Sequence, residues 1–220
     1  MTDHFWDPVK LSLEVAVVSG CIVLVLGLFI GKWMAKARFK GKAVIETIFL
    51  LPLVLPPTVV GFLLLVIFGK QSPIGQFIEW VFHQPVIFTW WAAVIAALIV
   101  SFPLMYQSAK AGFEGVDGDV EDAARVDGAN KLQLFMFVSV PLALKSIISG
   151  GILSFARALG EFGATLMFAG NIPGKTQTLP TAIYVAIDSG NMQMAWLWAL
   201  CMIGISFLML VCVQLSKAKS

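Results

Sequence analysis

The sequence predicts an all-α integral membrane protein with about five transmembrane helices. Of its 220 residues, 59% are hydrophobic and only 13% are charged, and the mean hydropathy is +0.88. Soluble domains are less apolar and carry about 25% charged residues. A bilayer core about 30 Å thick needs roughly 20 apolar residues for each helical crossing, so the chain has room for about five. The composition excludes a soluble enzyme and predicts a single transmembrane domain over residues 1–220.

Several apolar stretches are long enough to form these helices. They cover residues 11–34, 44–68, 87–106, 132–170 and 194–215. The fourth stretch is longer than one crossing and is interrupted by Pro141 and by charged residues, so its helix can begin near Pro141 or near Ser146. We expect one crossing there with an irregular outer extension. Residues 1–8 hold no Lys or Arg, and the apolar run that follows is long enough to span, so we expect the first helix to stay in place and not to be removed as a signal peptide.

The Lys and Arg residues of the loops predict the orientation, because insertion keeps basic loops on the cytoplasmic side. The first loop is strongly basic between Lys32 and Lys42, whereas the second holds only Lys70. We therefore predict an N-terminus outside, a C-terminus inside, the loop of residues 114–141 inside and residues 171–193 outside.

Other classes of function have no support in the sequence. A net charge of +2, spread along the chain, is too small for a nucleic-acid partner. His4 and His83 lie far apart, and the three cysteines lie inside apolar runs. We therefore predict no catalytic residue, no metal site and no cofactor bound by this chain. Residues 169–176 fit a loose phosphate-binding loop, but they follow an apolar helix and contain Pro173, which argues against that role.

The loop between the third and fourth apolar stretches is the most acidic part of the chain. Residues 114–128 hold six of the 13 acidic residues, so we expect a solvated surface. Asp117 or Asp119 is placed to cap a short helix, and Gly128 to end that helix in a left-handed conformation. A second, amphipathic helix is expected over residues 131–140. By itself the pattern is typical of a helical hairpin that connects two crossings.

Three prolines interrupt the second apolar stretch. Pro52, Pro56 and Pro57 each remove a backbone N–H, and Gly61 follows one turn later. The carbonyl groups that lose their partners at membrane depth must be satisfied by neighbouring helices or by water. Broken helices of this kind often line a transport path. The four residues are therefore candidates for a translocation path or gate, and a kink that only shapes helix packing is the alternative.

An ion pair is predicted in the fourth stretch. Arg157 and Glu161 lie four residues apart in apolar surroundings, so in a helix they share a face and can pair. Since pairing cancels most of the charge, a structural pair or gate brace is favoured over direct contact with an anionic solute, which stays open. Gly160 and Gly163 indicate a bend or break at the acid. The candidates for the path or gate here are Arg157, Glu161, Phe162 and Gly163.

The acidic loop resembles the coupling motif in membrane subunits of ATP-binding-cassette importers. That motif reads Glu-Ala-Ala, three residues, Gly, nine residues, Ile-x-Leu-Pro. Ala123, Ala124, Gly128 and Pro141 match it, whereas Asp122 replaces the Glu and valines replace the Ile and Leu. The resemblance implies that the short helix docks into a groove of a cytoplasmic ATPase. The candidate coupling residues are Glu121, Asp122, Ala123, Ala124, Arg125, Gly128 and Pro141.

Three further segments are similar to molybdate permeases of type I importers. They are residues 51–57, 156–164 and 170–180, and the resemblance extends from about residue 11 to residue 215. It implies a non-catalytic permease that moves molybdate, and also tungstate, by alternating access across the bacterial cytoplasmic (inner) membrane. The implied partners are a second copy of the chain, two ATPase subunits that hold ATP and Mg²⁺, and an external or periplasmic oxyanion-binding protein.

Two alternatives remain at this stage. Sulfate permeases are similar around Glu161, so the same fold with sulfate or thiosulfate as its substrate stays open. The alternative from another class is a membrane-embedded enzyme or a channel that works without an ATPase.

Overall fold

The computed structural model describes residues 5–218, with side chains through residue 211. His4 lies outside the described residues. Within the described part every regular element is helical, as predicted. Three helices are long and apolar enough to cross a membrane: α1 (Asp7–Lys36), α5 (Trp90–Glu114) and α12 (Met192–Ala218). Two bent helix pairs raise the number to five if each pair is one span, which agrees with the expected count.

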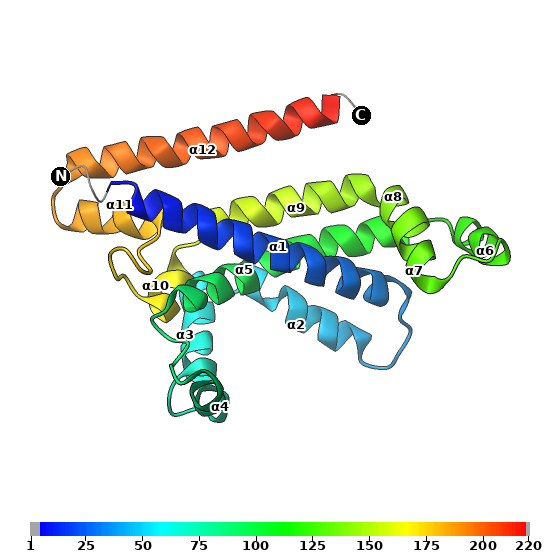
Figure 1. The fold of residues 1–220 in the computed structure, drawn as a ribbon, viewed down its shortest axis with the longest axis horizontal. Helices are drawn as coiled ribbons and strands as arrows, with labels where there is room; N and C mark the ends of the chain where they lie inside the picture. The colour runs from blue at the N-terminus through cyan, green and yellow to red at the C-terminus, as the bar shows by residue number, and fades with distance from the viewer. Residues whose placement is uncertain (1–4, 219–220) are drawn as a thin grey trace.

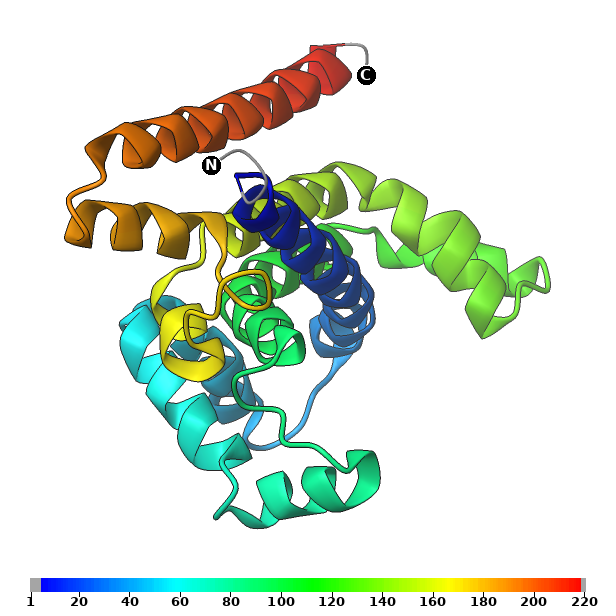
Figure 2. The same ribbon diagram turned by 60° about the vertical axis from the view of Figure 1, so that its left-hand side comes forward.

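The core of the bundle is formed by α1, α5 and α9 (Leu144–Leu159), which run side by side (Figures 1 and 2). Small residues allow the close approach. A Cβ atom on Gly27 would lie 2.5 Å from Met105 Cγ, and one on Gly31 would lie 2.9 Å from Ala109 Cβ. Helix contacts in membranes typically depend on such small residues, because lipid supplies no hydrophobic drive for association.

The second apolar stretch is not one straight crossing. It forms α2 (Lys42–Val54) and α3 (Pro57–Phe68), whose axes are bent by 117° at the break. Leu55 and Pro56 have extended backbones there, as expected from the two consecutive prolines. Helix α2 continues alongside α5, while α3 turns away from the bundle towards α4 (Pro73–Phe82) (Figure 1).

The fourth stretch is also divided. It begins with α7 (Lys131–Leu134), a π-helix η1 (Phe135–Ser139) and α8 (Val140–Leu142), and a bend of 78° separates these from α9. The long helix therefore begins at Leu144, between the two expected starting points. It ends at Leu159 with Gly160 as its C-cap, and α10 (Gly163–Ala169) follows, which confirms the break predicted around Glu161.

Two helices lie in segments for which we predicted only outer loops. They are α4 and α11 (Leu179–Asp188). Ser72 Oγ accepts a hydrogen bond from the N–H of Gly75 at 2.9 Å and caps α4. The N–H of Leu179 donates to Ser12 Oγ at 2.6 Å, which fixes the start of α11 on α1.

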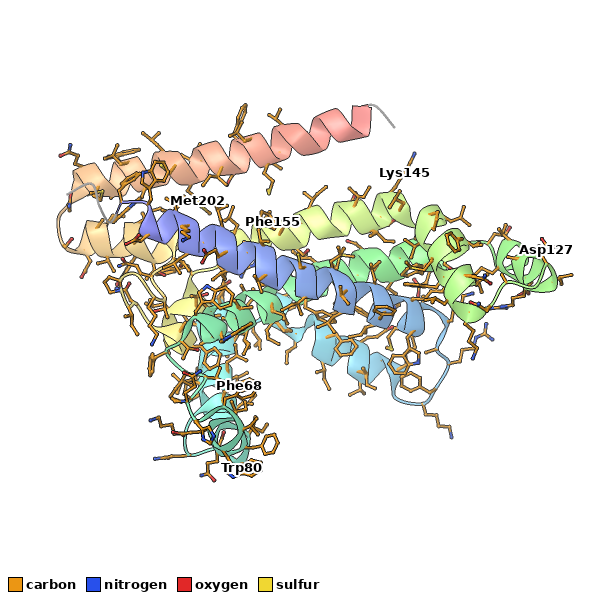
Figure 3. The ribbon with its side chains drawn as sticks, in the orientation of Figure 1. Phe68, Trp80, Asp127, Lys145, Phe155 and Met202 are labelled. Atoms are coloured by element: carbon orange, nitrogen blue, oxygen red, sulfur yellow. The ribbon has the colours of Figure 1, made fainter. Side chains whose placement is uncertain are left out.

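The acidic loop lies at one end of the molecule, and α10 and α11 lie at the other (Figure 1). The acidic loop, with Asp127 at its tip, lies far from α4, which carries Trp80 (Figure 3). The C-terminal end of α1 lies near the acidic loop, while the start of α1, α10 and α11 lie at the opposite end (Figure 1). Helix α12 packs on α11 (Figure 3), and most of the apolar side chains described on it, up to Val211, are exposed.

Candidate coupling and translocation sites

The acidic loop contains the predicted short helix, α6 (Gly118–Val126). Asp117 is its N-cap, and the Asp117 carboxylate accepts a hydrogen bond from the N–H of Asp119 at 3.0 Å. The chain leaves α6 through Gly128, whose φ of +90° lies in the left-handed region. Both ends of the helix are thus as predicted from the local residues.

One face of α6 is open. Asp122, Ala123 and Val126 are exposed, and Val126 is 88% exposed. The guanidinium of Arg125 lies 2.5 Å from the Asp122 carboxylate, so the two charges pair on the surface of the helix. A small alanine, an exposed valine and a paired charge together give a surface that a partner groove can accept.

Glu121 does not lie on the open face. We expected the acids of this loop to be solvated, but the Glu121 side chain is only 1% exposed. Its Oε1 atom lies 2.5 Å from Lys32 Nζ and accepts a hydrogen bond from Ser139 at 2.7 Å, and its Oε2 atom contacts Lys36. A buried carboxylate is tolerated when cations and donors surround it. The burial therefore corrects the expectation that Glu121 is solvated, and its assignment as a coupling residue stays a prediction.

The interrupted crossings meet each other. Helix α3 packs on α10, and a Cβ atom on Gly61 would lie 2.7 Å from Met167 Cβ and 2.8 Å from the carbonyl oxygen of Ala164. A Cβ atom on Gly163 would lie 3.0 Å from Pro57 Cβ. The structure thus brings Pro57 and Gly61 of the second apolar stretch together with Gly163 of the fourth.

Pro52 and Pro56 have different surroundings. Pro52 lies inside α2, and together with apolar residues of α1, α3 and α5 it lines an apolar groove of about 440 Å³. Pro56 is the N-cap of α3 and is exposed. Both prolines therefore lie at or near the bend, and their place in a translocation path stays a prediction.

The predicted ion pair is present. Arg157 Nη1 lies 2.7 Å from Glu161 Oε2, and the Glu161 side chain is 1% exposed. The other oxygen of Glu161 accepts a hydrogen bond from the N–H of Ala164 at 2.7 Å, so the carboxylate also caps α10. Phe162 packs against Tyr184 of α11, with ring centroids 5.4 Å apart. The pair therefore lies at the break between α9 and α10, and its role as a brace stays a prediction.

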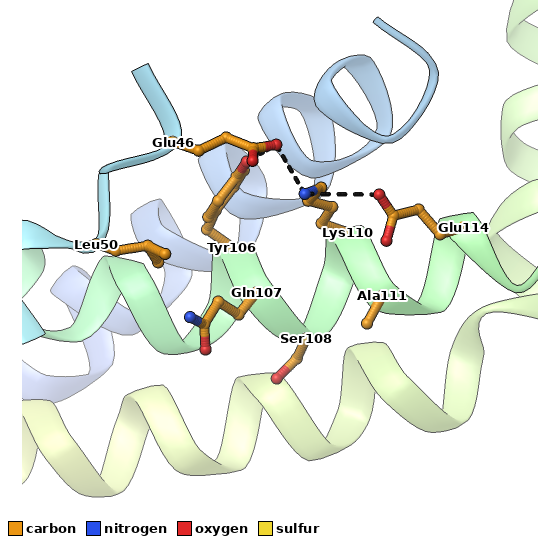
Figure 4. A pocket seen from close by; sticks show the side chains of 8 residues that line it. All are labelled: Glu46, Leu50, Tyr106, Gln107, Ser108, Lys110, Ala111 and Glu114. Atoms are coloured by element: carbon orange, nitrogen blue, oxygen red, sulfur yellow. Dashed lines mark hydrogen bonds and ion pairs between the residues drawn. The ribbon is translucent and has the colours of Figure 1, made fainter. Parts of the chain in front are cut away.

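A second ionic cluster was not predicted. Lys110 Nζ of α5 lies 2.7 Å from Glu46 Oε1 of α2 and 3.5 Å from Glu114 Oε1 (Figure 4). Tyr106 also donates a hydrogen bond to Glu46, at 3.4 Å. The cluster lines a cavity of about 470 Å³. A single sequence does not indicate which distant lysine faces Glu46.

Comparisons with known proteins agree with this architecture. The chain is 65% identical over 214 residues to YvgM of Bacillus subtilis, whose name describes a permease of a molybdenum transport system; the match covers 97% of this chain and 94% of YvgM. It is 44% identical over 189 residues to the molybdenum transport system permease ModB of Escherichia coli K12, with coverage of 86% and 82%. These matches confirm the resemblance to molybdate permeases.

Two further matches are more distant in sequence. The sulfate transport system permease CysW of Synechococcus elongatus is 32% identical over 214 residues, covering 97% of this chain and 74% of CysW. Among solved structures, a chain of the MetNI methionine ABC transporter in an inward-facing conformation is 16% identical, with a TM-score of 0.73 and coverage of 100% of both chains. That likeness supports the fold.

The family model that matches residues 24–219 is described as the inner membrane component of binding-protein-dependent transport systems. The description is of a transport component and not of an enzyme, in agreement with the sequence analysis. The match extends over most of the 220 residues. The chain therefore belongs to the family of inner membrane components of binding-protein-dependent transport systems.

Proposed function

We propose that this chain is the membrane-spanning permease of an ATP-driven importer for molybdate, with tungstate as a second substrate. The observation that carries the proposal is the higher identity to permeases named for molybdenum than to the sulfate permease. The exposed face of α6, presented beyond the end of the bundle, supports the ATP-driven part of the proposal (Figure 1).

The proposed assembly has two copies of the chain, two cytoplasmic ATPases and an external oxyanion-binding protein. The second copy is carried over from the resemblance to molybdate permeases, because lipid covers exposed apolar side chains such as those of α12 equally well. In this assembly the ATPases bind ATP and Mg²⁺. Each ATPase has a docking groove that receives Asp122, Ala123 and Ala124 of α6. The end of the bundle that holds α10 and α11 then faces the binding protein.

In this proposal transport follows from a shift between two conformations. ATP favours one conformation only if it changes the contacts that the ATPases make, and α6 is the element that receives that change. The junction of α3 with α10 is the proposed gate. Close backbone packing at Gly61 holds this junction together in the described conformation, and the Arg157–Glu161 pair lies where α10 follows α9.

Substrate selection in this proposal depends mainly on the binding protein. Arg157 is neutralised by Glu161 at 2.7 Å and is therefore a weak trap for an oxyanion. A path that holds its solute weakly also releases it readily, which suits a transporter. The permease then needs few residues that recognise molybdate.

The test is uptake of labelled molybdate by cells with and without the gene, in the presence of excess unlabelled tungstate or sulfate. We expect gene-dependent uptake that tungstate suppresses and sulfate does not. Loss of sulfate uptake in place of molybdate uptake would assign the substrate to sulfate. Uptake that persists after deletion of the ATPase gene would instead favour a channel.

A further inference from the structure

We propose that Glu121 is a positioning residue that fastens the coupling helix α6 to the end of α1 and to the π-helix η1. Through this contact, movement of α6 reaches α1 directly and not only along the chain through α7 and α8. The inference rests on the proposed function, because it assumes that α6 receives the ATPase movement.

The contacts of Glu121 come from separate elements. Its Oε1 atom lies 2.5 Å from Lys32 Nζ of α1 and 2.7 Å from Ser139 Oγ of η1. Lys32 Nζ also donates to Ser139 Oγ at 2.8 Å, so the three side chains form a closed triangle. Lys36, one turn further along α1, contacts the second carboxylate oxygen. A single side chain of α6 thus bonds to two elements that are distant in sequence.

Burial makes this contact different from a surface ion pair. The side chains of Glu121 and Lys32 are 1% and 17% exposed, and Ser139 is fully buried. Exposed ion pairs contribute little because water and salt screen them, whereas removing one partner of a buried pair leaves an uncompensated charge. Lys32 Nζ also lies 5.1 Å from the ring centroid of Phe113, so the contact extends to α5.

The π-helix provides a second observation. Ser139 is the last residue of η1, and it points inwards with 0% exposure while Met136 and Phe137 of the same segment are exposed. π-Helices are rare and occur frequently at functional sites, because the added residue changes which side chains face the interior. Here Ser139 is the residue that completes the triangle with Glu121 and Lys32.

In this arrangement the exposed face of α6 is available for docking, and the buried side contacts α1 and η1. Asp122 and Ala123 are exposed and remain available to a docking groove, while Glu121 is buried. Of the described residues, only Arg125, which pairs with Asp122 at 2.5 Å and lies 3.9 Å from Glu121 Oε2, forms ion pairs with both. A substitution at Glu121 can therefore change how movement is passed on without removing the docking face. This separation makes the inference testable apart from docking.

The experiment uses the complete transporter, with the ATPase and binding protein, and compares Glu121→Gln with Asp119→Asn. Asp119 lies on the same helix and is exposed, so its substitution makes the same charge change without touching the triangle. The readouts are co-purification of the ATPase, ATP hydrolysis and uptake of labelled molybdate. We expect Glu121→Gln to retain the ATPase but to raise the ATP hydrolysed per molybdate about tenfold, a change within the usual range of coupling between sites.

A second variant covers the case in which Glu121→Gln does not reach the membrane. Ser139→Ala removes the two hydrogen bonds that Ser139 makes with Glu121 and Lys32 without changing charge. We expect an increase of about fivefold in the same ratio, at the lower end for the loss of two hydrogen bonds. Wild-type ratios in Ser139→Ala and in any Glu121→Gln protein that assembles would overturn the inference. Failure of the wild-type chain to bind any ATPase would instead overturn the proposed function.

Discussion

The guanidinium of Arg157 lies 2.7 Å from the carboxylate of Glu161, across the break that separates α9 from α10. The same carboxylate caps α10 through the N–H of Ala164. Helix α10 in turn packs on α3 at Gly61. The two interrupted crossings are therefore joined, and the ion pair lies at the break between α9 and α10.

The Glu161→Gln variant should destabilise the protein while leaving α10 capped. Glutamine keeps an oxygen that accepts the N–H of Ala164, but it leaves Arg157 without its counter-charge. Removing one partner of a buried pair costs about 3–5 kcal/mol, and we expect the lower end because the Arg157 side chain is 28% exposed. Thermal unfolding in detergent measures the loss, with Asp188→Asn, an exposed acid, as the control. An unchanged melting temperature would show that the pair is not a brace.

The Gly61→Ala variant should separate α3 from α10. The added methyl group would lie 2.8 Å from both Cα and the carbonyl oxygen of Ala164, and backbone atoms cannot move aside as a flexible side chain can. Overpacking of this kind typically costs about 1–3 kcal/mol. We expect a lower melting temperature and slower molybdate uptake. Gly204→Ala is the matched control, because no atom lies within 4 Å of the added group; equal effects at both positions would contradict the packing argument.

The features predicted correctly from the sequence depend on neighbouring residues. Asp117, Gly128 and the prolines around the α2–α3 break act within one turn of the chain, so their effect follows from local geometry. Helix α4 also had a local signal that we did not use, since Ser72 and Pro73 form a typical N-cap with proline at the first position.

Other features depend on contacts between distant segments. Glu121 pairs with Lys32 across 89 residues, and no local pattern distinguishes it from the exposed acids beside it. The same holds for Glu46 and Lys110, and for the contact between Gly61 and Ala164. A single sequence predicts that a buried charge needs a partner, but the folded bundle decides which partner it has.

The Glu46–Lys110 pair should couple α2 to α5 energetically. Both side chains are about one-fifth exposed, at 22% and 21%, so we expect a coupling free energy of about 1 kcal/mol, at the upper end for partly exposed pairs. A double-mutant cycle with Glu46→Gln, Lys110→Gln and the double variant measures it by unfolding in detergent. Additive effects of the two single substitutions would show that the pair does not hold the helices together.

Gly128→Val should abolish transport while the protein still inserts. Valine is strained at a φ of +90°, although no neighbouring atom lies within 4 Å of the added group, so the effect arises from backbone conformation alone. The strain is expected to displace the end of α6 and to weaken ATPase docking. Gly118→Val is the matched control, because it adds the same side chain in open space at the other end of α6, where φ is not positive.

For these two glycine variants we would measure co-purification of the ATPase, abundance in the membrane and molybdate uptake. We expect Gly118→Val to retain most docking and transport and Gly128→Val to lose both at normal abundance. Both substitutions add the same apolar side chain. A difference in docking and transport between them would therefore show that both need the left-handed turn at Gly128. Normal uptake by a well-expressed Gly128→Val protein would remove α6 from the coupling mechanism.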